Sequence, residues 1–218
     1  MTQAPRLSST ATQLTDIETR AGDAALLRAH GEHVGERYDD AELSGRDLSG
    51  IAFSECVLTA ATLDDTQLRG SRFSETVLSS TFAPTLLAAR TSWRDILVDT
   101  PRWGSAELFD SELESVHIRG GKIDFLNLRT SRLVNVLIED CTITDLDLGG
   151  VRATRVALSN CRIGTLDLTR ANCADVDLRT SEFSAISGIE GMKGTTIDEW
   201  QLSLLAPLFA AHLGVVVD

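Results

Sequence analysis

The side chains of this sequence best suited to catalysis or metal binding are its histidines and cysteines, and their spacing forms no familiar site. The pair His30-x-x-His33 has no partner ligands at the spacing that zinc sites use. The sequence contains no phosphate-binding loop, no nucleophile motif and no acid–base pair. It therefore predicts a protein that holds no cofactor and no metal and that is not an enzyme. The residues concerned are His30, His33, His117, His212, Cys56, Cys141, Cys161 and Cys173.

The charge balance favours a protein partner over a nucleic acid. The 218 residues include 20 basic and 32 acidic side chains, which gives a net charge of −12. Such a surface repels DNA, RNA and anionic membranes, and it can attract a basic partner. No apolar stretch is long enough to span a bilayer, and the N-terminal residues MTQAPRLSST lack the apolar core of a secretory signal. We therefore expect a cytoplasmic protein with reduced cysteines.

These side chains must be positioned by an element that repeats every five residues. From Leu43 to Phe183 every fifth residue is apolar, which makes 29 consecutive central positions. Helices repeat at 3.6 residues and strands at two, so neither produces this period. The chain must change direction once every five residues while it returns one side chain to a common axis.

The columns beside these central positions indicate a short edge followed by a corner. The residue two places before each centre is mostly small or apolar, as at Ala61 and Val136, and should also point inward. The two residues after the centre are rich in Ser, Thr, Gly, Asp and Arg, and most of these types favour turns. In the second half the inward residues alternate in size with a period of ten, and the segments 123–128, 143–148 and 163–168 resemble one another. Both observations predict a four-sided coil of twenty residues.

The pattern resembles the pentapeptide-repeat family, whose motif is a small residue, then Asp or Asn, then Leu, then two variable residues. Clean copies are Leu166-Asp167-Leu168 and, with Glu at the second place, Ala41-Glu42-Leu43. The resemblance covers residues 41–185 and implies an all-β solenoid, namely a right-handed quadrilateral parallel β-helix. Its 29 units make about seven coils, or a rod of roughly 34 Å at the ~4.8 Å spacing of adjacent strands.

Two groups of inward residues need an interpretation in this register. Cys141 and Cys161 are one coil apart and point in parallel, which is a poor geometry for a disulfide, so we expect them to pack. Trp93 and Trp103 occupy central positions near the small Ala83. We expect their rings to fill space in a distorted coil, and a ligand pocket at this place is the alternative.

The register divides the chain into three parts. Residues 1–37 form an N-terminal segment or lid with a short helix, residues 38–190 form the β-helix, and residues 191–218 form a C-terminal capping helix and tail. The ends of a β-helix expose unpaired strand edges, which invite association unless they are covered.

The C-terminal helix is a candidate cover. Asp198 followed by Gln201 fits a capping box, Gly214 fits a helix stop, and Pro207 is expected to kink or split the helix. Its apolar residues could lie over the last coil or form a dimer interface. These cap or dimer residues are Ile197, Trp200, Leu204 and Leu208.

Two surface features are candidate interaction sites. The residue just before each centre should point outward, and on one face this column is an apolar ladder that a partner could cover. The preference of valine for strands is the alternative explanation. Acidic side chains also crowd one stretch of the sequence. The ladder consists of Val57, Val77, Leu97 and Leu137, and the acidic patch consists of Asp95, Asp99, Glu107, Asp110, Glu112 and Glu114.

The leading functional hypothesis is a non-catalytic scaffold for protein–protein interaction, as a monomer or a homodimer. The resemblance implies an alternative, because some pentapeptide-repeat proteins resemble a DNA duplex in size and charge. Such a DNA mimic would bind a type II topoisomerase, DNA gyrase, and modulate quinolone sensitivity. The net charge of −12 suits this alternative, whereas interleaved arginines such as Arg129 and Arg132 break up a DNA-like field.

Overall fold

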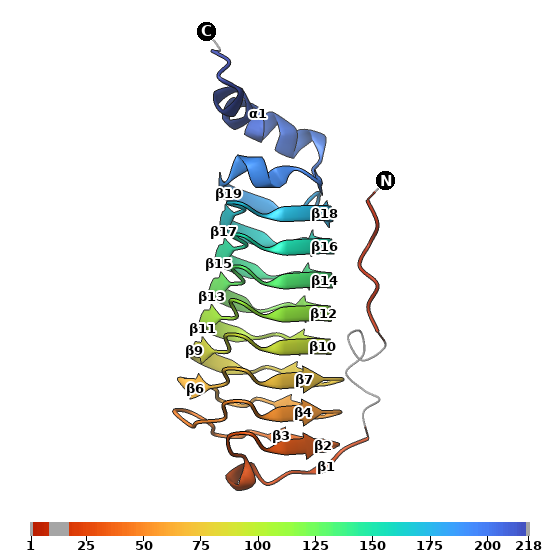
Figure 1. The fold of residues 1–218 in the computed structure, drawn as a ribbon, viewed down its shortest axis with the longest axis vertical. Coiled ribbons are helices and arrows are strands. Elements are labelled where there is room, and N and C mark those ends of the chain that lie inside the picture. The colour runs from red at the N-terminus through yellow and green to blue at the C-terminus, as the bar shows by residue number, and fades with distance from the viewer. Residues whose placement is uncertain (1, 9–17, 217–218) are drawn as a thin grey trace.

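The chain forms a rod of stacked β-coils (Figure 1), seen in a computed structural model that describes residues 2–8 and 18–216. One 13-stranded sheet runs the length of the rod. Its main path is β1 (Arg20–Ala21), β3 (Glu36–Asp39), β5 (Val57–Thr59), β8 (Val77–Ser79), β10 (Ser92–Asp99), β12 (Glu112–Arg119), β14 (Arg132–Glu139), β16 (Arg152–Ser159), β18 (Asn172–Asp177) and β20 (Thr195–Thr196).

The remaining strands complete the other sides of the coils. The 13-stranded sheet also contains three strands beside its main path, β2 (Glu32–Val34), β4 (Ala52–Ser54) and β7 (Arg72–Ser74). A 7-stranded sheet forms the opposite wall. Its members are β6 (Thr66–Gln67), β9 (Phe82–Leu87), β11 (Arg102–Glu107), β13 (Lys122–Asn127), β15 (Thr142–Asp147), β17 (Arg162–Asp167) and β19 (Glu182–Ser187).

The register of the parallel strands confirms the twenty-residue coil. Leu113 pairs with Leu133 in one sheet, and Ile123 pairs with Ile143 in the other. All 29 central positions from Leu43 to Phe183 are buried. Each coil therefore lays its central side chains on those of the coil before it, and the apolar core is a continuous column.

The β-helix is longer than the sequence pattern indicated. It has about nine turns rather than about seven, or roughly 43 Å at ~4.8 Å per turn. The sheet already begins at β1, within the residues assigned to an N-terminal segment, and it ends at β20. The five-residue register continues backward through Tyr38 and His33, which stand at central positions. These polar rings hid the first turn, because an apolar residue was required at each step.

Polar residues in the inward columns are paired with backbone carbonyls. The Thr66 hydroxyl donates to the carbonyl oxygen of Leu43 at 2.8 Å, and the Ser71 hydroxyl donates to that of Leu48 at 3.1 Å. The indole N–H of Trp93 donates to Thr91 Oγ1 at 2.7 Å. Buried polar groups need such partners, so these small hydroxyl residues fit a core otherwise made of leucine.

The coils around the two central tryptophans are regular, contrary to the distortion expected there. Arg102 pairs with Phe82 and with Lys122 in the standard register. Trp93 continues a stack of aromatic rings. Its ring centroid lies 4.7 Å from that of Phe73, and the Phe73 centroid lies 5.5 Å from that of Phe53. The small alanines of neighbouring sides leave room for these rings, as the sequence indicated.

The corners of the coils repeat every five residues. Within one coil Arg90, Asp95 and Thr100 have φ values of 59°, 56° and 50°, in the left-handed region. The fourth corner, at Ser105, lies inside β11. A side chain in the left-handed region costs about 1 kcal/mol, and the paired strands on both sides offset this cost.

The N-terminal end of the column is closed by a short helix and an arginine. The helix η1 (Ala24–Leu26) precedes Leu27, whose side chain is buried in the core. The Arg46 guanidinium donates to the carbonyl oxygen of Ala24 at 2.6 Å and to that of Leu27.

The C-terminal end is closed by η2 (Ile189–Met192) and by α1 (Glu199–Leu213). The capping box of Asp198 and Gln201 is present, and Gly214 ends the helix in the left-handed conformation. The helix continues through Pro207, so the expected split does not occur. No helix among the described residues has the length and apolar character that a membrane span requires.

Candidate interaction surfaces

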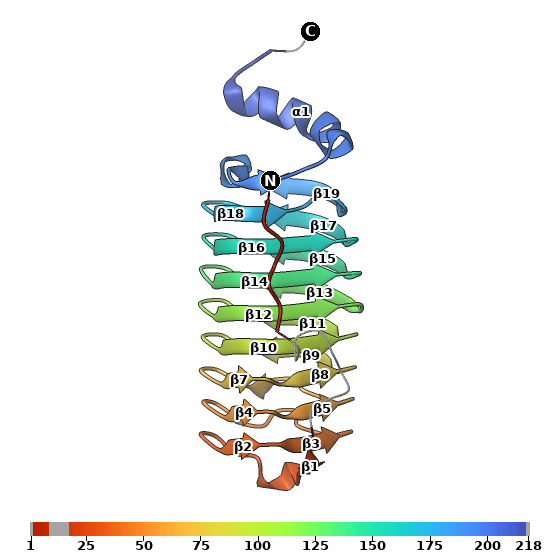
Figure 2. The ribbon, with the colours of Figure 1, turned by 90° about the vertical axis from the view of Figure 1, so that its right-hand side faces the viewer.

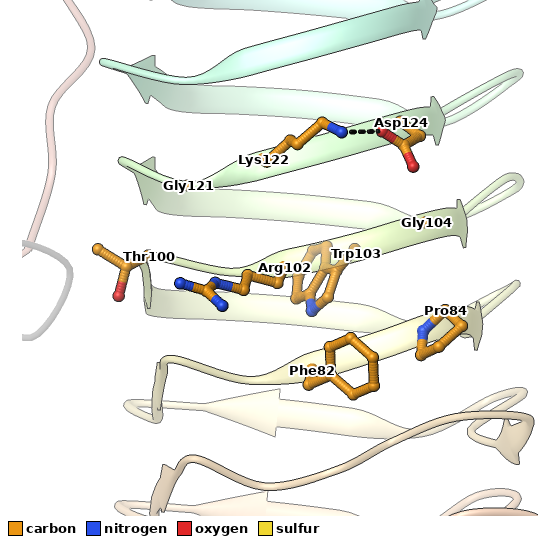
Figure 3. Close-up of a pocket in the computed structure, with 9 residues that line it drawn as sticks. All are labelled: Phe82, Pro84, Thr100, Arg102, Trp103, Gly104, Gly121, Lys122 and Asp124. Carbon is orange, nitrogen blue, oxygen red and sulfur yellow. Dashed lines mark ion pairs between the residues drawn. The ribbon is translucent and has the colours of Figure 1, made fainter.

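An open hollow lies on the face formed by β9, β11 and β13 (Figure 3). It encloses about 890 Å³. Phe82, Arg102 and Lys122 follow one another on its wall, one from each strand. The Phe82 ring is 48% exposed. The full lining is Phe82, Pro84, Thr100, Arg102, Trp103, Gly104, Gly121, Lys122 and Asp124.

The hollow exists because two of its positions must be glycine. A Cβ at Gly104 would lie 2.3 Å from the carbonyl oxygen of Pro84. A Cβ at Gly121, where φ is +98°, would lie 2.3 Å from the carbonyl oxygen of Pro101. Because neither position can carry a side chain without moving the adjacent coil, the face is locally depressed.

The charges of the hollow suit an anionic group beside an apolar surface. Lys122 Nζ lies 3.1 Å from Asp124 Oδ1. Within the described residues no carboxylate lies within ion-pair distance of the Arg102 guanidinium. A guanidinium next to an exposed phenyl ring can hold a carboxylate whose stem packs on the ring. The sequence interpretation named a ligand pocket near Trp93 and Trp103 as the alternative, and the hollow lies beside Trp103.

The C-terminal helix presents one side to the rod and the other to solvent. Gln201 and Leu205 face the last coil and are buried. The Gln201 amide donates to the carbonyl oxygens of Leu178 at 2.6 Å and Ser181 at 2.7 Å. This side chain therefore satisfies acceptors that the last coil leaves open.

The apolar residues predicted for this helix divide between its two sides. Ile197 is half-buried against the core. Trp200, Leu204 and Leu208 are 60%, 49% and 45% exposed. Residues at i, i+4 and i+8 share one side of a helix, so these three form an apolar stripe directed away from the coils.

The apolar ladder expected on one face is not an exposed surface. Val57, Val77 and Leu97 point away from the central column, yet they are buried and form a separate small cluster. Leu137, further along the same face, is half-buried. The first three side chains therefore expose almost no surface in this structure.

The acidic patch expected between residues 95 and 114 is not one patch. A stretch of twenty residues passes once around the rod, so Asp99 and Glu107 lie in different sheets, and Glu112 and Glu114 share a third position in β12. Several of them are also paired, since Asp99 lies 2.5 Å from Arg119 and Glu114 lies 3.7 Å from Arg94. Several acidic residues that are close in the sequence therefore lie on different sides of the rod.

Cys141 and Cys161 lie beside each other in neighbouring coils and form no disulfide, as the sequence indicated. The four cysteines are free and buried, and burial raises the pKa of the Cys173 thiol to about 11. His117 is buried, with Nε2 3.2 Å from Glu139. Among the described residues no group of three His, Cys, Asp or Glu side chains could hold a metal ion.

One polar cluster was missed by the sequence interpretation. At the N-terminal end of the column the Tyr38 hydroxyl donates to Glu36, and His33 Nδ1 lies 3.0 Å from the same carboxylate. Donation by Tyr38, supported by Arg20, lowers the pKa of Glu36 to about 2. Burial and the Glu36 charge raise the pKa of Tyr38. The signal that could have found the cluster is the five-residue register, which places His33 and Tyr38 in the central column.

Comparisons with known proteins agree with this architecture. Residues 39–74 match the family model for pentapeptide repeats, in 8 copies. No curated protein sequence matches the chain.

Solved structures of similar shape include full-length QnrB1, a plasmid-mediated fluoroquinolone resistance protein. QnrB1 has 15% identity and a TM-score of 0.34, and the match covers 82% of this chain and 99% of that one. HetL, a pentapeptide-repeat protein from the cyanobacterium Nostoc involved in heterocyst differentiation regulation, has 15% identity and a TM-score of 0.26, with 81% and 94% covered. These similarities are too low to carry a functional inference. The family match over residues 39–74 and the five-residue register, which continues along the rod, show that the chain has a pentapeptide-repeat β-helix fold.

Proposed function

We propose that this protein is a non-catalytic scaffold that binds another protein through the outer side of its C-terminal helix. The observation that carries the proposal is the apolar stripe of Trp200, Leu204 and Leu208, which is about half exposed on a rigid support. Large apolar side chains grouped on a surface mark association sites in soluble proteins. The same helix uses Gln201 and Leu205 to close the rod, so its stripe is free to serve a second purpose.

The partner on this stripe is a second copy of the chain or a different protein. Replacing Trp200, Leu204 and Leu208 by serine should abolish the association and leave the thermal stability within a few degrees of that of the intact protein, because the stripe faces solvent. Leu26→Ser is the matched control, since Leu26 is 61% exposed at the other end of the rod. Light scattering and sedimentation measure the self-association.

A photo-cross-linking residue at position 204 identifies a different partner. Discrete adducts at position 204 and none at position 26 support the proposal. A monomeric protein that forms no more adducts at 204 than at 26 contradicts it.

Binding to DNA gyrase as a DNA mimic is the second candidate, favoured by a net charge of −12 on a narrow rod. Ion pairs on the rod weaken this candidate, because they reduce the negative field that a DNA mimic needs. Arg129 lies 3.0 Å from Asp147 and 3.7 Å from Asp167, and so it neutralises a row of carboxylates along one side. A supercoiling assay with purified gyrase tests this candidate directly. Inhibition, or protection from a quinolone, at micromolar protein would establish it, and no effect at tens of micromolar would remove it.

A further inference from the structure

The N-terminal segment of residues 2–8 runs along the outside of the rod, across the stacked strands rather than parallel to them. Figures 1 and 2 show it beside β12, β14, β16 and β18 in both views. Its direction is that of the rod axis, so each part of the segment meets a different coil.

Three polar contacts fix the position of this segment. The Ser8 N–H donates to Ser115 Oγ at 2.8 Å. The Arg6 N–H donates to Asn135 Oδ1 at 3.2 Å, one coil further along. The hydroxyl of Thr2 forms a hydrogen bond with that of Thr196 in β20. An extended chain rises about 3.3 Å per residue, so two residues are enough to reach from one coil to the next.

The edge of the rod beneath the segment is suited to an extended peptide. Ser115 and Asn135 are corner residues with left-handed φ values of 56° and 55°, which direct their side chains outward at coil-to-coil spacing. Leu137 follows Asn135 in β14, and Ala157 stands at the equivalent position of β16; both are half-buried. The edge therefore offers polar acceptors in a row beside an apolar strip.

The segment has the complementary pattern. Pro5 and Leu7 are half-buried, whereas the side chains of Ala4 and Arg6 are exposed. From Ala4 to Leu7 alternate residues thus face the rod, as in an extended strand that covers an apolar surface on one side.

We propose that this edge is a peptide-binding site and that residues 2–8 are its intramolecular occupant. The partner that the edge fits is an extended segment of another protein, with apolar residues at alternate positions and free backbone N–H groups between them. Such a partner must displace residues 2–8 first, so the segment acts as an autoinhibitory strap. The inference rests on the proposed function, to which it adds a second surface, and its test is independent of the C-terminal helix.

The test uses the full chain and a labelled peptide of residues 1–10. Leu7→Asp weakens the strap and leaves the edge unchanged, so the peptide should bind this variant at least tenfold more tightly than it binds the intact protein. A peptide that itself carries Leu7→Asp is the matched control and should not bind. Fluorescence anisotropy gives both affinities.

An engineered disulfide should hold the strap on the edge. In the variant Thr2→Cys/Thr196→Cys a mild oxidant should join the two new cysteines, as peptide mapping by mass spectrometry would show. The oxidised protein should lose peptide binding, and a reductant should restore it. Equal affinity of all forms, absence of binding to Leu7→Asp, or failure of the disulfide to form overturns the proposal. A disulfide that joins two chains assigns the strap to a second copy and overturns the intramolecular arrangement.

Discussion

The two ends of the rod are closed by the same kind of contact in opposite directions. At the N-terminal end the coil supplies the donor, since Arg46 reaches the carbonyls of Ala24 and Leu27 in the cap. At the C-terminal end the cap supplies the donor, since Gln201 reaches the carbonyls of Leu178 and Ser181 in the coil. The acceptors of these side-chain bonds thus belong to the cap at one end and to the solenoid at the other.

This difference indicates which end the solenoid depends on more. Removing the Arg46 guanidinium loosens a short helix, whose carbonyls can then meet water. Removing the Gln201 amide leaves the Ser181 carbonyl without this donor beneath an apolar cover, where water does not replace it, while the Leu178 carbonyl still accepts from the Ser181 N–H. Buried acceptors without a partner are more costly than exposed ones.

The largest expected effect comes from removing the C-terminal cover entirely. A chain that ends at Thr196 lacks α1 and exposes the last coil, including the edge that Leu205 and Gln201 cover. Its β signal in circular dichroism should persist, while light scattering should detect large species formed by end-to-end association. A chain that ends at Gly214 keeps the helix and is the control. If the shorter chain has the same mass in solution as the control, the helix is not a necessary cover.

Gln201→Leu should lower the free energy of unfolding by about 2 kcal/mol, because it removes two buried hydrogen bonds and leaves the Ser181 carbonyl without this donor. Chemical denaturation measures the change. Ser203→Ala lies on the exposed part of the same helix and should stay within about 0.5 kcal/mol of the intact protein. A loss for Gln201→Leu as small as that of the control would show that the amide is dispensable.

Arg46→Met should lower the free energy of unfolding by about 1 kcal/mol. This is less than the loss expected for Gln201→Leu, because water can reach the carbonyls that Arg46 contacts. The methionine retains the apolar stem of the arginine, so the loss reports on the guanidinium. Arg72→Met, at an exposed position of β7, is the matched control. A larger loss for Arg46 than for Gln201 would reverse the ranking of the two ends.

The smallest expected effect is a pH dependence confined to the N-terminal end. The pKa of Glu36 falls from its ordinary 4.5 to about 2 in the folded protein, chiefly through donation by Tyr38. A lowered pKa in the folded state contributes stability above pH 4.5, and this contribution is lost as the pH falls from 4.5 towards 2.

Glu36→Gln and Tyr38→Phe should both reduce this loss in thermal unfolding scans between pH 2 and 5. The exposed Glu182→Gln should leave it unchanged. If the Glu36 variant loses as much stability in acid as the intact protein, the pH dependence does not originate at Glu36. The C-terminal contact involves the uncharged Gln201, so no such dependence is expected there.

The fold was predictable from the sequence because the core imposes a strict period. Every central residue contacts its equivalents in the neighbouring coils, so apolar side chains must recur along the sequence at twenty-residue spacing. The capping box at Asp198 and Gln201 was predictable for a similar reason, since both contacts lie within one turn of helix. The first turn was missed because His33 and Tyr38 place polar rings in an apolar column.

The surfaces were less predictable because the contacts that cover or expose them do not repeat along the sequence. Val77 and Leu97 are outward positions by register, and only their burial in the folded chain shows that they are covered. The contact of Ser8 with Ser115 joins residues far apart in sequence, and neither residue type marks it. The role of Gln201 could have been found, because it stands twenty residues after the inward Ser181.

The corners of the coil limit how the length of this protein can change. Between Arg90 and Asn160 three corners of each coil are left-handed and the fourth lies inside a strand, as Ser105 does, whereas all four corners are left-handed between Gly45 and Ser80. An insertion of five residues in the later part keeps the inward column but moves one left-handed corner of each following coil onto the side where the corner lies in a strand. An insertion of twenty residues restores all four corners, and the Gln201 amide still finds its two carbonyls. Rods of this kind should therefore grow and shrink by whole coils, through duplication or deletion of segments that encode twenty residues.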